Sequence, residues 1–310
     1  MNPELMVNPA RNEWISEQAC VSMARTCNLY CVYCHNPPTG EKRDILKTAA
    51  ALKKKGVKAV SLEGGGEPTA GGDFFDWIKA LKAAGVKRFM LSTNAVALAD
   101  AAFCRRAARE IEYFTVNFPS HREEVYAKIT RSVKFRMALR GLANLKALGA
   151  EEKIRFFHIV SAGNYRLLPE FAVWAARNFP RAAFVNFTFV RNKGRALKAG
   201  GIVPRYTQVA PFIKLALAAL RVKGHKTVVQ NMPLCALKDF EGFSFEFQRW
   251  RRGDKVLEDG IDPKAPCAAC ARCTLKDACC GARPDYLKVH GAAELKASRK
   301  DPMFITPERF

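Results

Sequence analysis

Long hydrophobic runs are absent from this chain. The most apolar stretch, Phe212 to Leu220, is short and is interrupted by Lys214, whereas a helix needs about 20 apolar residues to cross a bilayer. The opening residues, MNPELMVNPARNEW, also lack the apolar centre of a secretion signal. These absences argue against a membrane protein, and we predict a cytoplasmic location with no membrane partner.

Acidic residues are few relative to basic ones. The chain has 29 Asp and Glu but 51 Lys and Arg, which gives a net charge of +22 at pH 7. Such an excess indicates an anionic partner, either nucleic acid, an acidic peptide or an anionic surface. The basic residues are spread along the whole chain, however, so a lysine-coated surface without a specific partner explains the charge equally well.

Neither a disordered nor a collagen-like composition fits, because 49% of the residues are hydrophobic and 26% are charged. The 310 residues suffice for two domains of about 150 residues each or for one α/β barrel. We expect no disulfides among the eleven cysteines in a reducing compartment. The cysteines therefore indicate metal or redox chemistry.

Strand and helix patterns alternate through the middle of the chain. We predict strands at 19–25, 58–62, 88–92, 112–117, 153–160 and 183–190, and helices at 45–55, 74–84, 98–109, 135–148, 167–178 and 211–222. Strands separated by helices imply a parallel sheet with right-handed crossovers. The six units are compatible with an open doubly wound sheet or with most of a barrel, and the pattern alone does not choose.

After about Asn231 this rhythm ends, and the remaining segment is rich in Cys, Arg, Asp and Gly. We interpret it as a small irregular unit held together by metal. Within it, Phe243, Phe245 and Phe247 precede a basic run that ends at Arg252. Their alternation favours a β-hairpin with a basic outer face, and stacking on nucleic-acid bases is the alternative.

Three cysteines follow the first predicted strand. Cys27, Cys31 and Cys34 have the spacing C-x3-C-x2-C. Three thiolates on one short loop can bind three irons of a 4Fe–4S cubane and leave the fourth iron open to a small molecule. Structural zinc needs four closed ligands, and His35 is placed to supply a fourth, so zinc stays the alternative.

This loop, with Tyr33 directly before its third cysteine, resembles that of the radical S-adenosylmethionine (radical SAM) superfamily. Residues 63–69 (EGGGEPT), after the second strand, are similar to the family's Gly-Gly-Glu-Pro loop. Asn94-Ala95, after the third strand, is similar to its Asn-Gly turn, with Ala in place of Gly. All three loops follow the carboxyl ends of strands, where α/β folds bind ligands.

The resemblance implies a partial (β/α)6 TIM-like barrel over residues 18–230, preceded by an N-terminal segment, 1–17. It also implies a 4Fe–4S cluster held by the three cysteines of the loop. The cluster would cleave S-adenosylmethionine to a 5′-deoxyadenosyl radical, which would abstract hydrogen from a substrate. The residues that would bind S-adenosylmethionine are Gly65, Gly66, Glu67, Asn94 and, with a weaker match after the fifth strand, Ser161. The sequence does not name a catalytic acid or base.

A second group of cysteines lies in the segment 231–310. Its C-x2-C-x5-C spacing resembles the core of the SPASM extension of radical SAM enzymes, but Arg283 stands where that pattern has its fourth cysteine. The resemblance therefore implies a shortened, twitch-like extension with one auxiliary 4Fe–4S cluster. Its ligands would be Cys235, Cys270, Cys273 and Cys279, with Cys267 and Cys280 in reserve. A zinc ribbon is the alternative.

Enzymes with such extensions include peptide and protein maturases, so we predict an oxidoreductase that modifies a peptide. Only 26 residues precede Cys27, and we therefore expect a separate peptide-recognition protein together with an electron donor such as flavodoxin or ferredoxin. Alternatives are a small-molecule dehydrogenase, an RNA-modifying enzyme and, more remotely, a non-enzymatic iron–sulfur or zinc module. Lys193, Arg195 and Lys198, after the sixth strand, are placed to guide an acidic substrate.

Overall fold

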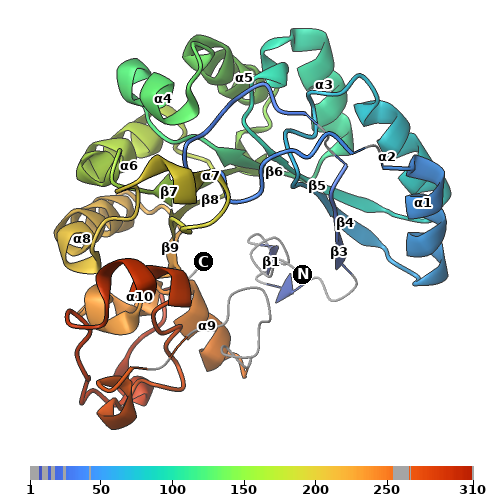
Figure 1. The fold of residues 1–310 in the computed structure, drawn as a ribbon. Helices are drawn as coiled ribbons and strands as arrows, with labels where there is room; N and C mark the ends of the chain where they lie inside the picture. The colour runs from blue at the N-terminus through green and yellow to red at the C-terminus, as the bar shows by residue number, and fades with distance from the viewer. Residues whose placement is uncertain are drawn as a thin grey trace.

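The computed structural model describes residues 7–8, 13–14, 18–23, 26–41, 43–253, 265 and 267–308. Seven parallel strands form one curved sheet in the order β3-β4-β5-β6-β7-β8-β9 (Figure 1). Helices α1 to α6 and α8 cover its convex side, and α9 and α10 lie beyond β9. This arrangement confirms the partial α/β barrel with a cysteine-rich C-terminal part.

The strands agree with the predicted positions to within a few residues. Their bounds are β3 Gln18–Val21, β4 Ala59–Leu62, β5 Arg88–Thr93, β6 Tyr113–Asn117, β7 Ile154–Val160, β8 Phe184–Phe189 and β9 Thr227–Gln230. Every neighbouring pair is parallel. The carboxyl ends of all seven strands therefore meet at one edge of the sheet.

The helices fill the connections between successive strands. They are α1 Ile45–Lys54, α2 Phe74–Ala83, α3 Ala101–Glu110, α4 Glu123–Thr130, α5 Phe135–Ala147, α6 Leu168–Asn178, α7 Arg195–Ala199 and α8 Tyr206–Val222. Two of them have an aspartate as N-cap. Asp44 before α1 accepts the N–H of Lys47, and Asp100 before α3 accepts the N–H of Phe103. A further pair of short strands, β1 Val7–Asn8 and β2 Glu13–Trp14, is antiparallel.

The structure differs from the expected order in three places. The sheet has a seventh strand, β9, which is too short for its pattern to stand out after Gly224. Helix α4 precedes α5 in the connection between β6 and β7, where only the helix at 135–148 was expected. Helix α8 begins at Tyr206 and contains Pro211 inside it, although we placed that proline at the helix start.

The predicted hairpin at 243–252 is wrong, because these residues form the helix α9, Phe245–Arg251. Ser244 caps the helix by accepting the N–H of Phe247. Both phenylalanine side chains of the helix are buried, but in different places. Phe245 packs with Phe184 and Val228 under the barrel, whereas Phe247 packs in the C-terminal part. Burial on two sides produced the alternation that we interpreted as a strand.

The two faces of the sheet are packed differently. Its convex face forms the large core with the helices, for example through Trp77 and Leu142. Inside the barrel, Ala59, Met90 and Tyr113 form a separate cluster, and the guanidinium of Arg155 lies 3.7 Å from the centre of the Tyr113 ring. This packing closes the amino-terminal side of the barrel, so the open side is the edge with the carboxyl ends of the strands.

None of the helices in the described part of the chain combines the length and the apolar composition that crossing a bilayer requires. The predicted N-terminal segment 1–17 lies mostly outside the described residues. The domain boundaries at 18–230 and 231–310 stay predictions.

Candidate functional site

The three loops that the sequence singled out meet at the carboxyl edge of the sheet. Cys27, Cys31 and Cys34 follow β3 and line one cavity of about 320 Å³. The glycine loop after β4 and the asparagine turn after β5 line the same cavity. Of the residues predicted to bind a cofactor there, the structure brings together Gly65, Gly66, Glu67 and Asn94.

The cysteine loop is held by its backbone. The N–H groups of Tyr30 and Val32 donate to the carbonyls of Thr130 and Ile129, each at 2.9 Å, so the loop is docked on the carboxyl end of α4. The Tyr33 side chain is buried, and its hydroxyl donates to Asn117 at 2.9 Å. The aromatic residue before the third cysteine is therefore a packing residue that fixes the loop against β6.

The thiols of this loop are partly buried. Burial, followed by the neighbouring Cys27 and Cys34, raises the pKa of Cys31 to about 12. Burial also raises the pKa of Cys27 and of Cys34, while the guanidinium of Arg195 acts in the opposite direction on all three thiols. The thiols are thus protonated until a metal binds and displaces their protons.

The glycine loop brings bare backbone to the cavity. Gly64, Gly65 and Gly66 all have positive φ, at 74°, 66° and 139°. Only glycine adopts such a run without steric cost. A ligand can therefore approach the backbone of this loop closely.

Glu67 is buried at the end of the glycine loop, with 4% of its surface exposed. Its carboxylate accepts the hydroxyls of Thr69 at 2.6 Å and Thr93 at 2.7 Å, and the N–H of Asn94 at 2.7 Å. Burial raises the pKa of Glu67 although these hydrogen bonds oppose the shift. Glu67 thereby joins the loops after β4 and β5.

Asn94 is oriented from both sides. Its side-chain amide donates to Asn28 at 2.6 Å and its side-chain oxygen accepts the N–H of Val96 at 3.1 Å. The next residue, Ala95, has φ 64°. This is the left-handed conformation that the glycine of the family's Asn-Gly turn would adopt. The turn therefore keeps its shape with alanine, at a steric cost of about 1–2 kcal/mol.

Ser161 lies away from the other predicted residues. It is buried after β7, where its N–H and hydroxyl contact Asn164 Oδ1 at 2.8 and 3.2 Å. The structure does not place it among the residues that line the cysteine cavity. Its contact with a cofactor stays a prediction.

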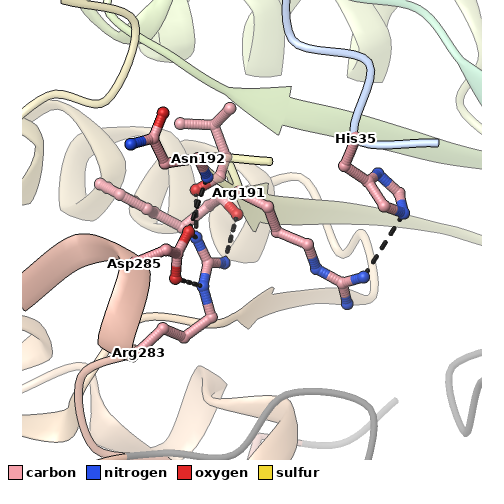
Figure 2. A network of polar contacts seen from close by, with 7 residues as sticks. His35, Arg191, Asn192, Arg283 and Asp285 are labelled. Carbon is pink, nitrogen blue, oxygen red and sulfur yellow. Dashed lines mark hydrogen bonds and ion pairs between the residues drawn. The ribbon is translucent and has the colours of Figure 1, made fainter. Parts of the chain in front are cut away.

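Sequence reasoning missed several residues of this cavity. Asn117 ends β6 and Thr188 lies in β8, and both line it. The position of Asn117 at the carboxyl end of a strand was a signal that could have found it. His35 and Arg191 form part of the wall, with Arg191 Nη1 lying 3.4 Å from His35 Nε2 (Figure 2). Arg195, one of the three basic residues predicted to guide an acidic substrate, completes this basic wall, whereas Lys193 and Lys198 are not among the residues that line the cavity.

The C-terminal cysteines line a second cavity of about 280 Å³. The structure brings together all four predicted ligands there, together with one of the reserve residues: Cys235, Cys267, Cys270, Cys273 and Cys279. The other reserve residue, Cys280, is fully buried outside this lining and its thiol donates to the Gly281 carbonyl at 3.3 Å. Cys267 is therefore the better placed of the two reserves.

Backbone N–H groups point at the sulfurs of this second cavity. Cys279 Sγ accepts from Leu234 and Gly281, and Cys273 Sγ accepts from Ser298, each at 3.3 Å. A hydrogen bond with Cys280 is the largest cause that lowers the pKa of Cys279 to about 7. Such hydrogen bonds stabilise thiolate ligands of iron–sulfur clusters.

Two thiol-lined cavities fit iron–sulfur clusters by the chemistry of their donors. Each iron of a cubane binds its own thiolate, so thiols spread around one cavity suit it. Within the described ranges, no three His, Cys, Asp or Glu side chains converge on one position for a single metal ion. The fit rests on the sulfur donors and on their shared cavities.

Comparison with known proteins agrees with the resemblance to radical SAM enzymes that the first cysteine loop, the glycine loop and the Asn94 turn indicated. Residues 21–163 match the family described as the radical SAM superfamily. The matched range contains the first cysteine loop, the glycine loop and the Asn94 turn.

The similarity to individual relatives extends over only part of their length. The chain is 30% identical over 177 residues to the mycofactocin maturase MftC of Mycobacterium tuberculosis, covering 54% of this chain and 43% of that protein. It is 28% identical over 135 residues to a probable GTP 3′,8-cyclase of Saccharolobus islandicus, covering 42% of this chain and 43% of the other. The match thus spans less than half of these curated relatives.

Solved structures share the fold at low identity. Native anSMEcpe with bound AdoMet matches 84% of this chain and 70% of its own, at a TM-score of 0.57 and 16% identity. Streptococcus suis SuiB bound to precursor peptide SuiA matches 69% of this chain and 48% of its own, at a TM-score of 0.51 and 15% identity.

Proposed function

We propose that this chain is a radical SAM oxidoreductase that modifies a peptide or protein. The observation that carries the proposal is the single cavity shared by Cys27, Cys31 and Cys34, the glycine loop and the Asn94 turn. A 4Fe–4S cluster held there by the three cysteines would supply the electron that cleaves S-adenosylmethionine, and the 5′-deoxyadenosyl radical so formed would abstract hydrogen from the substrate.

Different residues of the chain would bind the cluster, S-adenosylmethionine and the substrate. Cys27, Cys31 and Cys34 supply three thiolates for the cluster. The backbone of Gly65 and Gly66 borders the space for S-adenosylmethionine. Asn94 borders the same space, and Glu67 holds it in place through the 2.7 Å hydrogen bond. The remaining wall, which includes Thr188 and Arg191, is left to contact the substrate.

The second cavity has the composition of an auxiliary cluster site. Cys235, Cys270, Cys273 and Cys279 are our proposed ligands, and Cys267 is the residue that would replace one of them. A site of this kind, with Arg283 in place of a further cysteine, fits a shortened SPASM or twitch extension. We propose that it receives an electron from the substrate radical or positions the substrate.

A peptide is the substrate that the observations favour. MftC carries the name of a maturase, and the SuiB structure contains a precursor peptide. The basic wall formed by His35, Arg191 and Arg195 favours a peptide with a carboxylate near the reacting residue. We expect a separate peptide-recognition protein and an electron donor such as flavodoxin or ferredoxin as partners.

A nucleotide is the second candidate. The same basic wall is suited to phosphate groups, and one group of relatives is named as probable GTP 3′,8-cyclases. The two candidates differ in what stimulates the reaction: an acidic precursor peptide for the first and a nucleoside triphosphate for the second.

The decisive experiment is formation of 5′-deoxyadenosine by the anaerobically reconstituted, dithionite-reduced chain. We expect slow formation from S-adenosylmethionine without substrate, and none in Cys31→Ala, because a missing thiolate leaves the cluster incomplete. Cys104→Ala is the matched control, since Cys104 is buried in the core behind the sheet and lines neither cavity. Undiminished formation in Cys31→Ala would refute the proposed cluster site.

A further inference from the structure

Arg283 of the C-terminal part is a buried charged side chain, with 1% of its surface exposed. Burying a guanidinium is costly unless its donors are paired. Its Nε and Nη2 donate to the two oxygens of Asp285, both at 2.9 Å. It also donates to the carbonyls of Phe189 and Val190, at 3.3 and 2.5 Å. Arg283 therefore binds the carboxyl end of β8 as well as its own neighbour.

Asp285 extends this contact into the loop between β8 and α7. Its Oδ2 accepts the N–H of Asn192 at 2.6 Å. Burial would raise the pKa of Asp285, but the hydrogen bond and charge of Arg283 overcome that effect and lower it. Residues on both sides of Arg191 are thus anchored to the C-terminal part, and Figure 2 shows Arg191 extended from this anchored backbone toward His35.

The other end of the same loop is pressed against the first cysteine loop. The N–H of Arg195 donates to the carbonyl of Cys34 at 2.8 Å. Gly194 lies so close that a Cβ on it would be 2.6 Å from the Cys34 carbonyl oxygen and 2.7 Å from that of His35. The Arg195 guanidinium also lies 3.6 Å from the centre of the Tyr30 ring. The two loops are in direct backbone contact.

These contacts form a continuous path. It runs from Arg283 and Asp285, through residues 189–195, to the loop of Cys27, Cys31 and Cys34. The path begins within four residues of Cys279, a proposed auxiliary ligand. We propose that Arg283 and Asp285 are positioning residues for the first cluster loop, so that the C-terminal part sets the geometry of the site where radical chemistry begins.

The sequence position of Arg283 gives this role its significance. It stands where the resembling SPASM pattern has a cysteine. In this chain the position has no sulfur donor and its side chain points to β8 instead, in a fork that suits a carboxylate and carbonyl oxygens. The C-terminal part has one fewer candidate ligand and gains a fixed attachment to the barrel.

Amide hydrogen exchange of the full chain tests this inference. Arg283→Lys keeps a positive charge but loses the fork. We expect the amide of Arg195 to exchange roughly tenfold faster, because its hydrogen bond belongs to the path. The amides of Tyr30 and Val32 should follow, because they hold to α4 the cysteine loop that the path reaches. The glycine loop at 63–69 should be unchanged. Arg299→Lys, at an exposed arginine of the same part, is the matched control and should change none of these amides.

Gly194→Ala tests the path from its other end without touching the C-terminal part. Its Cβ must displace the cysteine loop, so the amides of Tyr30 and Val32 should exchange faster while those near Arg283 keep their protection. In reconstituted protein, both variants should also lose iron from the first cluster to a chelator several times faster. That iron is identified as the portion missing from a Cys27/Cys31/Cys34→Ala variant.

Two results would overturn the inference. One is unchanged exchange in 27–36 when 189–195 opens in Arg283→Lys; the other is a uniform rise over the whole barrel, which would make Arg283 a general stability residue. The inference rests on the proposed role of the three cysteines. The exchange measurement on metal-free protein needs no cofactor, however, so its failure is distinguishable from failure of the proposed function.

Discussion

The backbone N–H of Asn94 donates to the carboxylate of Glu67 at 2.7 Å, and this bond joins the loops after two neighbouring strands. The other carboxylate oxygen accepts the hydroxyls of Thr69 and Thr93. A buried acid with this many donors is a structural centre of the site. The relationship between Glu67 and Asn94 therefore predicts how each change at Glu67 acts.

Glu67→Gln should be mild and Glu67→Ala severe. Glutamine can turn its oxygen to the Asn94 N–H and its amide to the threonine hydroxyls, which can accept. Alanine leaves buried donors without partners, at about 1–3 kcal/mol for each. We expect urea unfolding to show a loss of less than about 1 kcal/mol for Gln and about 2–4 kcal/mol for Ala.

The same variants test how Glu67 serves the cofactor. If it acts by holding Asn94, S-adenosylmethionine should bind to Glu67→Gln within about threefold of the original affinity and much more weakly to Glu67→Ala. A loss above tenfold in Glu67→Gln, measured by equilibrium binding, would instead show that the carboxylate's charge contacts the ligand directly.

Iron and sulfide analysis should find about eight of each in anaerobically reconstituted protein, because two cubanes hold four each. Changing Cys27, Cys31 and Cys34 together to Ala should remove about half of both. Cys104→Ala should keep the full content. Tightly bound zinc in the C-terminal part, with only about four irons in the chain, would contradict the auxiliary cluster.

Cys270→Ala/Cys273→Ala should release the auxiliary cluster, because both thiols line the second cavity. Some loss of folding stability is expected, since a metal that organises an irregular segment contributes to folding. Formation of 5′-deoxyadenosine without substrate should persist, whereas product formation on the true substrate should stop. Product at a near-normal yield from this variant would reduce the cluster to a structural role and favour a redox-neutral reaction.

His158 should make stability depend on pH. It is buried, its Nδ1 lies 3.0 Å from the Phe118 carbonyl, and burial lowers its pKa to about 3. Below the unfolded value of about 6.5, the unfolded chain binds a proton that the folded chain does not. Stability should therefore fall as the pH falls from about 6.5 toward 3, by up to about 1.4 kcal/mol per pH unit.

Urea unfolding of the metal-free chain at pH 7 and pH 5 checks this sign. His158→Gln should flatten the difference between the two pH values even if it lowers stability at pH 7. Burial also lowers the pKa of His225, which is more exposed than His158, so His225→Gln should flatten it less. An unchanged pH dependence in His158→Gln would contradict the assignment.

Local patterns were enough to predict most of the barrel. Gly and Asp residues mark helix ends, and apolar strands recur between amphipathic helices. The strands β4 through β8 and the helices α1, α2, α3, α5 and α6 therefore lie where the sequence indicated. The three ligand loops were also predictable, because parallel strands bring their carboxyl ends to one edge. That rule predicts that Cys27, Gly65 and Asn94 lie close together.

Tertiary packing decided the rest. The alternation of Phe245 and Phe247 predicted a strand, but burial against two different cores produced the helix α9. The contact of Ser161 with a cofactor stays a prediction, and only the folded structure shows that its N–H and hydroxyl both contact Asn164 Oδ1.

By itself the sequence determined which chemical groups this protein carries: three thiols at fixed spacing, a glycine loop and a second cysteine group. Only the tertiary structure decided how those parts are joined. Arg283 and Val190 are far apart in the chain, yet a buried guanidinium must find oxygen partners, and the carbonyls at the end of β8 supply them. No local pattern encodes such a pairing, because it depends on which strand end the folded C-terminal part reaches.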